Sequence, residues 1–380
     1  MRRSTYDAIV IGARCAGAPT AMLVARAGAS VLLVDRATFP SDTLSGHAVK
    51  PPGVAYLQRW GVLDEVLATG CPPVYTRQVT ICDQALPAPP PDLDSLPLLA
   101  PRRTVLDMIL VQAARRAGVH VHEQTTLSAV VRDGDRVVGV EGKCKHGDPM
   151  RALAPVVIGA DGKQSWLARQ VGAAYTHYVP TVSLAYFAYW SGFNTDGLTL
   201  HFTPGQATGI FPTNAGQTLV FVQARIARRA EFQADVPGQY LAALRRVPAV
   251  AEKLAGATRA SPILGMLDQP AYFRESYGPG WALVGDAAHH KDPLAARGIT
   301  DAFRDAELVA KAIRAGLGGE TDLLPALAEC EAVREATARP VSELNHRLAE
   351  LPDDASEITE RFGELVRAEA NADAQPATRA

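Results

Sequence analysis

The chain has 380 residues, of which 47% are hydrophobic and 21% are charged, and its formal net charge is -2. These proportions are typical of a globular protein of two or three domains, and the near-neutral charge argues against nucleic acid as a partner. The five cysteines are odd in number and lack CxxC spacing, so we expect reduced thiols, with no disulfide and no metal site.

The chain begins with an apolar strand pattern within its first eleven residues, which leaves no room for a signal peptide. No run of about 18 apolar residues follows, so no transmembrane helix is predicted. We therefore expect a cytoplasmic protein that works without a membrane and binds small molecules. The sequence does not distinguish a monomer from a homodimer.

The first 36 residues have the pattern of a βαβ unit. Residues 6–11 form a β-branched apolar run, Gly12 and Gly17 bracket a loop that leads into a helix, and residues 30–34 repeat the buried-strand pattern before Asp35. A helix N-terminus behind a glycine-rich loop offers N–H groups to a pyrophosphate, and the acid can bind a ribose. The unit therefore predicts a dinucleotide site.

Arg14 stands where the GxGxxG fingerprint has its second glycine. It either adds positive charge near the phosphates or marks a site that has lost its function. The strand-helix-strand context and Asp35 favour dinucleotide binding over a purely structural turn. We interpret the neighbouring Cys15 as a packing residue rather than a reactive thiol.

The next hundred residues alternate between helix and strand patterns. His47 and Lys50 follow the second strand and either face the cofactor or lie in a solvated loop. Helices are predicted near residues 53–60 and 104–117, and strands at 119–122, near 129–140, and at 156–158. The last of these strands ends close to Asp161, at the edge where parallel sheets bind ligands.

The middle of the chain changes to alternating, aromatic-rich runs. Residues 181–224 predict an antiparallel sheet with one half-buried face. Its large side chains either line an aromatic pocket or pack in the core: Tyr186, Tyr189, Trp190, His201, Phe202 and Phe211. Helices are predicted within 231–254, at 298–315 and beyond, and residues 371–380 resemble a frayed tail.

A further buried strand is predicted in GPGWALVGDAAHH, with an acid at its end. Three buried strands are thus each followed by glycine and aspartate, and together they resemble a known family. The segment GDAAHHKDPLAARGITDAFRDA, residues 285–306, matches GDAAHxxxPxxxxGxxxAxxDA, the GD motif of FAD-dependent monooxygenases of the single-component aromatic hydroxylase, para-hydroxybenzoate hydroxylase-like type. GADGKQSWLAR, residues 159–169, resembles the DG motif of the same family.

The resemblance implies a para-hydroxybenzoate hydroxylase-like α/β fold with three parts. A Rossmann-like FAD-binding domain would comprise residues 1–75, 101–175 and 265–318. An inserted antiparallel-sheet substrate domain would comprise 76–100 and 176–264, and a C-terminal helical region 319–380.

The resemblance also implies how FAD would be held. Asp286 would bind the ribityl chain, Pro293 would lie beside the reactive edge of the flavin, and the helix that starts at Gly298 would face the flavin C2 carbonyl. The residues expected to contact FAD are Gly12, Ala13, Arg14, Ala16, Gly17, Asp35, Arg36, Arg103, Asp161, Gly162, Gly285, Asp286, Pro293, Arg297, Gly298, Ile299 and Thr300.

Three positions depart from the family pattern. Besides Arg14, Thr300 stands where the GD motif often has asparagine, and Arg169 is one residue further from Ser165 than is usual. No second GxGxxG occurs, so the resemblance implies that NAD(P)H binds transiently as a co-substrate.

The leading hypothesis is that NAD(P)H reduces bound FAD, and that O2 then gives a flavin C4a-hydroperoxide that oxygenates an aromatic or polyketide-like small molecule. His47 or His201 could accept a phenolic proton at neutral pH, and Pro293 would adjoin the reaction. Tyr189, Phe211 and Pro212 are the candidates for substrate contact.

Three alternatives remain open. A flavin-dependent halogenase shares the fold, but its WxWxIP signature is absent, since TGIFPTN has no tryptophan. A reductase of the geranylgeranyl type would saturate a double bond without O2. A flavin-binding protein without turnover is disfavoured by the intact GD motif.

Overall fold

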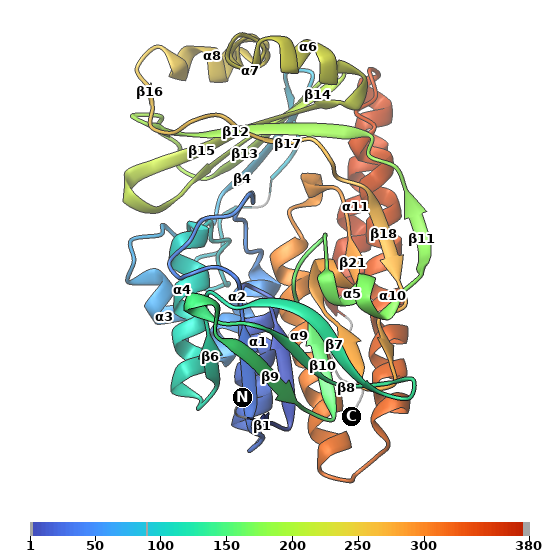
Figure 1. Cartoon of the computed structure of the whole chain (residues 1–380). Coiled ribbons are helices and arrows are strands. Elements are labelled where there is room, and N and C mark those ends of the chain that lie inside the picture. Colours follow the sequence, from blue (N-terminus) through green and yellow to red (C-terminus); the bar gives the residue numbers. More distant parts are fainter. Residues whose placement is uncertain (1–2, 89, 375–380) are drawn as a thin grey trace.

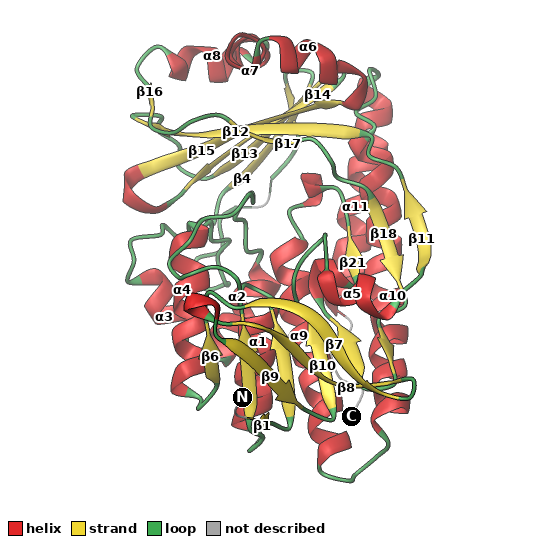
Figure 2. Cartoon of the chain, viewed as in Figure 1, coloured by secondary structure: helices red, strands yellow, loops and turns green. Residues whose placement is uncertain are grey.

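The computed structural model describes residues 3–88 and 90–374. Figure 1 shows a lower part built around a parallel sheet, an upper sheet covered by helices on its outer side, and C-terminal helices that run between the two parts. Loops occupy much of the region between the lower sheets and the upper sheet (Figure 2). The site described below is built mainly from these loops.

The lower part contains a sheet with the strand order β19-β20-β10-β2-β3-β6. All neighbours are parallel except β19 and β20. Residues of β2, β3, β10 and β20 are buried throughout, which explains their apolar sequences, because a parallel sheet is covered on both faces. The bounds are β2 (Ala8–Ile11), β3 (Val31–Val34), β6 (His120–His122), β10 (Val156–Gly159), β19 (Tyr277–Gly278) and β20 (Trp281–Leu283).

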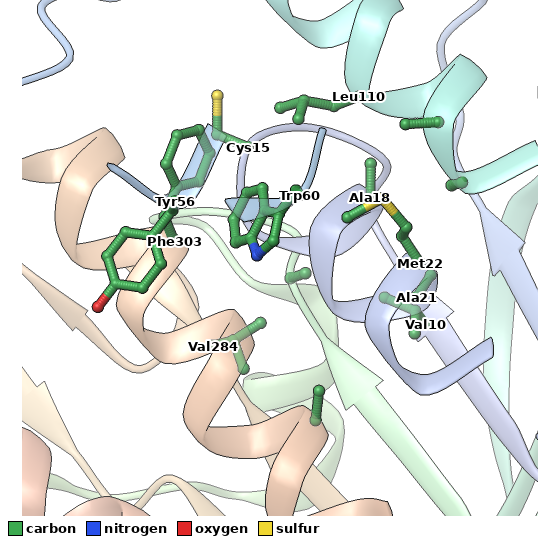
Figure 3. Close-up of a cluster of buried hydrophobic side chains, with 14 of the residues drawn as sticks. Val10, Cys15, Ala18, Ala21, Met22, Tyr56, Trp60, Leu110, Val284 and Phe303 are labelled. Carbon is green, nitrogen blue, oxygen red and sulfur yellow. The ribbon is translucent and has the colours of Figure 1, made fainter. Parts of the chain in front are cut away.

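Helices pack on one face of this sheet. The bounds are α1 (Gly17–Arg26), α2 (Pro51–Arg59), α3 (Leu63–Leu67), α4 (Arg103–Arg116) and α9 (Gly298–Leu317). Figure 3 shows their common core, in which Met22 of α1 lies near Val10 of β2 and Trp60 lies near Phe303. The Trp60 and Phe303 rings meet edge to face with centroids 4.9 Å apart. This packing fixes the N-terminal ends of α1, α2 and α9 near the same edge of the sheet.

A meander covers the other face. It has the strand order β1-β9-β8-β7, with β1 (Arg3–Thr5), β7 (Thr126–Asp133), β8 (Arg136–Lys143) and β9 (Pro149–Leu153), and α5 (Trp166–Val171) packs beside it. The strands predicted near residues 129–140 are therefore confirmed. The turn at Gly134, within the segment RDGDR, divides them into an antiparallel pair.

The upper sheet has the order β16-β12-β15-β14-β13-β4-β5, and β17 also pairs with β12. Its pairs are antiparallel except for β4 with β13. The bounds are β4 (Arg77–Ile81), β5 (Gln84–Ala85), β12 (Ser183–Ser191), β13 (Leu198–Thr203), β14 (Gln206–Pro212), β15 (Gln217–Arg225), β16 (Thr258–Arg259) and β17 (Leu264–Met266). Helices α6 (Arg229–Ala234), α7 (Val236–Arg245) and α8 (Pro248–Leu254) cover its outer face.

The remaining elements connect the two parts. A small sheet contains β11 (Tyr175–Val179), β18 (Ala271–Arg274) and β21 (His289–His290), and the C-terminal helices are α10 (Leu323–Ala349) and α11 (Ala355–Ala374). The frayed tail was wrong for residues 371–374, which continue α11, and residues 375–380 lie outside the described residues. None of the described helices combines the length and the apolar character that a bilayer span requires. The predicted α/β fold, with an antiparallel sheet inserted and helices at the C-terminus, is confirmed.

Candidate functional site

The carboxyl ends of four adjacent parallel strands, β3, β2, β10 and β20, bring the glycine- and aspartate-containing segments together. Ile11 of β2 pairs with Val34 and with Gly159, and Gly159 pairs with Leu283. The loops that follow these strands therefore leave the sheet at one edge, where α/β proteins bind their ligands. Segments more than 250 residues apart in the chain meet there, since Gly285 lies opposite Ala16.

The first loop requires glycine at two positions. Gly12 has φ +95°, and a Cβ there would lie 2.5 Å from the carbonyl oxygen of Ala160. A Cβ on Gly17 would lie 1.7 Å from the Gly12 carbonyl oxygen. Asp35 supports the loop, because its carboxylate accepts hydrogen bonds from Ala13 N at 2.7 Å and Ala37 N at 2.8 Å. The loop is thus shaped so that backbone N–H groups, and no side chain, face a ligand at the α1 N-terminus.

Arg14 is held by an acid that the sequence patterns did not reveal. Its Nη1 donates to Asp107 at 2.6 Å, and Arg103 donates to both oxygens of Asp107 at 3.0 and 3.1 Å. Asp107 is fully buried, and the buried thiol of Cys15 lies 3.2 Å from one of its oxygens. Burial raises the pKa of Cys15, so this thiol stays protonated. Two guanidinium groups on one carboxylate leave this side of the loop positively charged.

The DG and GD motifs are connected through one tyrosine. Asp161 accepts hydrogen bonds from Ser165 Oγ at 2.5 Å and Trp166 N at 2.7 Å, which orders the start of α5, and burial raises its pKa. The Tyr272 hydroxyl lies 2.5 Å from the Asp286 carbonyl oxygen and 3.1 Å from that of Lys163. The two motifs, far apart in sequence, therefore hold a fixed relative position.

The N-terminus of α9 opens onto free space. Gly298 is exposed although its neighbours Arg297 and Ile299 are buried, and a Cβ on Gly298 would meet no atom of the described residues within 4 Å. Beneath it, Asp301 binds Lys291 at 2.6 Å, Arg304 at 2.8 Å and Arg297 at 3.3 Å. Burial alone would raise the pKa of Asp301, but these three cations hold it well below its usual range.

The segment before Gly298 is tied to the upper sheet. Asp292 precedes Pro293 and accepts hydrogen bonds from Ser183 of β12 and, at 2.7 Å, from Gln223 Nε2 of β15. Asn345 of α10 donates to its carbonyl oxygen at 2.8 Å. Burial raises the pKa of Asp292. This contact was not predicted from the sequence, in which the aspartate next to the motif proline is the available signal.

The inner face of the upper sheet carries two of the expected substrate residues. Residues directly opposite in a sheet share a face, and Tyr189 lies opposite Leu219, which lies opposite Phe211. His47 joins them from below, with its ring stacked on Tyr189 at 5.7 Å and a hydrogen bond between Nε2 and the Tyr189 hydroxyl. The Arg102 guanidinium lies 3.5 Å from the centroid of the Tyr189 ring.

These surroundings correct the role expected for His47. Burial, together with Arg103 and Arg102, lowers the pKa of His47 to about 3. A ring with this pKa does not take up a phenolic proton near neutral pH. Burial also raises the pKa of Tyr189, so the pair is neutral and offers a hydroxyl group rather than a base.

His201 and Pro212 do not join this group. His201 lies opposite Thr208, Thr208 lies opposite Val222, and Val222 lies opposite Tyr186. These four residues therefore share one face of the sheet, the outer face covered by helices. There His201 borders a cavity of about 380 Å³ beside α8 and is hydrogen-bonded to Thr80. Pro212 alternates with Phe211 and faces the same outer side. The expectation that these two residues share a pocket with Tyr189 was therefore wrong.

The described residues fit FAD at this edge of the sheet. In the loop of Gly12, Ala13, Ala16 and Gly17, Gly12 N donates to the Val34 carbonyl oxygen and Ala13 N donates to Asp35. The backbone N–H groups that face a ligand are therefore those at the α1 N-terminus, Ala16 and Gly17. Asp35 and the exposed Arg36 stand beside its far end, and the open α9 N-terminus with Gly298, Ile299 and Thr300 stands beyond Asp286. The Thr300 hydroxyl is buried without a partner among the described residues. Arg14, Arg103 and Arg297 differ from the expectation, because their guanidinium groups are engaged by acids of the protein itself.

A dinucleotide loop, a second binding loop at the same sheet edge and an inserted sheet define a flavin-dependent oxidoreductase. A family model described as FAD binding domain matches residues 5–340. The chain therefore belongs to this family, which includes the para-hydroxybenzoate hydroxylase-like monooxygenases, and the resemblance is confirmed.

Known relatives include proteins with different reactions. The chain is 29% identical over 341 residues to menaquinone reductase of Mycolicibacterium smegmatis, covering 83% of this chain and 78% of the relative. It is 26% identical over 323 residues to 6-methylpretetramide 4-monooxygenase of Streptomyces rimosus, covering 79% and 73%. The flavin-dependent brominase Bmp2 has the same fold, with a TM-score of 0.83 at 19% identity over 98% of this chain and 94% of the other.

Proposed function

We propose that the protein is an FAD-dependent monooxygenase that uses NAD(P)H and O2 to oxygenate an aromatic or polyketide-like small molecule. FAD, when bound, would supply the electron transfer and the activation of O2. The protein's own residues would bind and orient the substrate and keep water away. The observation that carries the proposal is the aromatic inner face of the upper sheet, which lies on the side of the loops that hold the cofactor.

This inner face is suited to a flat, apolar ligand. Phe187, Tyr189 and Phe211 are buried on it, and half-buried side chains surround them, namely Phe221, Leu264 and Met266. Offset or edge-on packing against such rings favours a planar aromatic substrate. The Asp292 contacts fix the distance between this face and the segment around Pro293. Substrate would thus be positioned by the sheet and cofactor by the loops below.

Arg102 supports a substrate with an acidic oxygen. Its guanidinium lies against Tyr189, and its Nε is buried without a hydrogen-bond partner among the described residues. A buried, unpaired guanidinium N–H is costly, and a phenolic or carboxylic oxygen would satisfy it. The Tyr189 hydroxyl offers a second polar contact beside it. Neither group needs to change its protonation state near neutral pH.

A cavity of about 260 Å³ beside the DG motif supports transient binding of NAD(P)H. Arg274 stands between the rings of Tyr175 and Tyr272, at 4.5 and 4.7 Å from their centroids. Cations suit the phosphates of a dinucleotide and tyrosine rings suit its bases. Tyr272 also contacts the Asp286 carbonyl. The residues of this cavity that we assign to NAD(P)H are Lys163, Arg169, Tyr175, Tyr178, Tyr272 and Arg274.

A reductase is the second candidate, favoured by the 29% identity with menaquinone reductase. Such an enzyme would use the same FAD and the same hydride donor but would saturate a carbon–carbon double bond without O2. An extended apolar substrate would then lie along the inner face of the upper sheet in place of a compact ring.

The test is turnover of the FAD-loaded protein with NADH or NADPH in the presence of phenols, polycyclic aromatics and prenylated quinones. A monooxygenase consumes O2 in proportion to product and inserts one atom of 18O2. A reductase gives a product heavier by two hydrogens under anaerobic conditions, and a halogenase requires halide and transfers it. Anaerobic product formation, or halide in the product, would overturn the monooxygenase proposal.

A further inference from the structure

The C-terminal helix α11 ends at the cofactor side of the molecule. Figure 1 shows it running down from the upper sheet toward the lower part. Glu369 and Asp373 lie one turn apart near its end. Glu369 accepts a hydrogen bond from Lys50 Nζ at 2.5 Å, and Asp373 binds Arg297 through Nη2 at 2.6 Å and Nη1 at 3.0 Å.

The two cations, Lys50 and Arg297, both occupy the N-cap position of a helix. Lys50 is the N-cap of α2, and Arg297 is the N-cap of α9, immediately before the exposed Gly298. The Arg297 side chain is only 1% exposed, whereas that of Asp373 is 26% exposed. Asp373 therefore approaches from the rim of the site and holds a cation that belongs to its interior, whereas the Lys50 and Glu369 side chains are about equally exposed, at 17% and 16%.

The charge around α9 explains why acids are needed here. Lys291, Arg297 and Arg304 all converge on Asp301, so one carboxylate faces three cations. The positive end of the α9 dipole adds to this surplus. Burial together with Arg297 lowers the pKa of Lys50, although Glu369 opposes the effect. The acids of α11 thus offset positive potential at the N-terminus that opens toward the cofactor.

Apolar packing determines where these acids lie. Leu365 and Ala372 of α11 belong to one buried cluster with Leu294 and Ala295, which lie in the turn just before Arg297. The same cluster includes Phe202 of the upper sheet. Partly exposed ion pairs by themselves are too weak to hold a helix in place. The helix is therefore positioned by its core contacts, and the two acids act at fixed positions.

We propose that α11 is part of the FAD site, in which Asp373, assisted by Glu369, sets the positive charge that Arg297 and Lys50 present to the flavin and thereby its reduction potential. Reduction adds negative charge to the flavin, which nearby cations stabilise. Each acid that neutralises such a cation favours the oxidised form. Asp373 and Glu369 are thus positioning residues that act through their basic partners. The inference rests on FAD binding and does not depend on the oxygenation proposed above.

The test is the midpoint potential of the bound flavin in the FAD-loaded full chain, measured anaerobically by equilibration with redox dyes and without substrate. We expect Asp373→Asn to shift the potential to more positive values and Glu369→Gln to shift it in the same direction by less. Glu360→Gln is the matched control, because Glu360 is an exposed acid on the same helix. This control should leave the potential unchanged.

Two further outcomes separate electrostatics from a merely structural role. Asp373→Glu restores the carboxylate and should restore the potential of the unmodified protein. If Asp373→Asn fails to retain FAD, the comparison of Glu369→Gln with Glu360→Gln carries the test. The proposal is overturned if the α11 variants match the Glu360→Gln control, or if the shift is negative. Because neither O2 nor substrate is present, these outcomes are independent of whether the enzyme is a monooxygenase.

Discussion

Gly17 has the least space of the residues that shape the loop between β2 and α1, where we propose that FAD binds. Its missing Cβ would overlap the carbonyl oxygen of Gly12, which is backbone and cannot move without opening the β2–α1 turn. We predict that Gly17→Ala abolishes FAD binding, measured by flavin fluorescence titration. Gly363→Ala in α11 is the control, since its nearest contact is a flexible arginine and alanine is the better helix former. Retention of FAD by Gly17→Ala would mean that this loop does not contact the cofactor.

His47 makes stability depend on pH in a defined direction. Its folded pKa of about 3 lies below the unfolded value of about 6.5, so unfolding takes up a proton between these values. The folded state therefore loses up to about 1.4 kcal/mol of unfolding free energy per pH unit as the pH falls from 6.5 toward 3. Above pH 6.5 His47 contributes no pH dependence.

His47→Asn removes this proton uptake while keeping a side chain that tolerates the local φ of +61°. We predict that its unfolding free energy, measured by urea denaturation, falls less steeply between pH 7 and pH 5 than that of the unmodified protein. The comparison cancels the other buried histidines, His201, His289 and His290, which both proteins retain. Equal slopes would show that His47 is not held neutral in the folded state.

Some properties of these residues follow from the local sequence, whereas others depend on packing between distant parts of the chain. The glycines of the first loop and Asp35 were predicted from the sequence, because strand, loop and helix are contiguous and their steric demands are local. The lowered pKa of His47 was not predicted, since it depends on Arg102, Arg103 and burial beneath β12, whose residues lie more than 130 positions later. Asp107 was missed for a similar reason, because its partner Arg14 is 93 residues away.

The two faces of the upper sheet show how far the alternation of side chains along a strand predicts their surroundings. The pattern of β12 to β15 identifies which residues share a face, but both faces of β12 are buried, so hydrophobicity does not tell which one meets the cofactor. That choice depends on α6 to α8, which cover the outer face. His201 and Tyr189 were therefore equally plausible candidates from the sequence, and only the tertiary packing separates them.

This assignment of faces predicts that, of two substitutions in neighbouring strands, one changes the KM and the other does not. Phe211→Leu, on the inner face, should raise the KM for the aromatic substrate by roughly fivefold, because a lost ring contact is worth about 1 kcal/mol. His201→Gln, on the outer face, should leave KM and kcat unchanged. Steady-state kinetics with the substrate found in the turnover screen would check both. An effect of His201→Gln comparable with that of Phe211→Leu would contradict the assignment.

At the scale of the molecule, the proposed cofactor site is assembled from the beginning, the middle and the end of the chain. The GD motif predicted the segment around Asp286 because ten matched positions fall within 22 residues. Contacts from α10 and α11, such as Asn345 with Asp292 and Asp373 with Arg297, have no local pattern. They arise because the C-terminal helices pack against both parts of the molecule at once.

This assembly predicts that FAD stabilises the whole fold. A ligand bound by the β2, β10 and β20 loops and by the α9 N-terminus is lost on unfolding of any of them, so removal of FAD should lower the melting temperature. At free FAD one hundred times its Kd, the stabilisation is about 2.7 kcal/mol, a shift measurable by calorimetry. Gly17→Ala should melt at the same temperature with and without FAD. If FAD saturated the unmodified protein without raising its melting temperature, the ligand would not be held by the folded sheet edge, because binding there must favour the folded state.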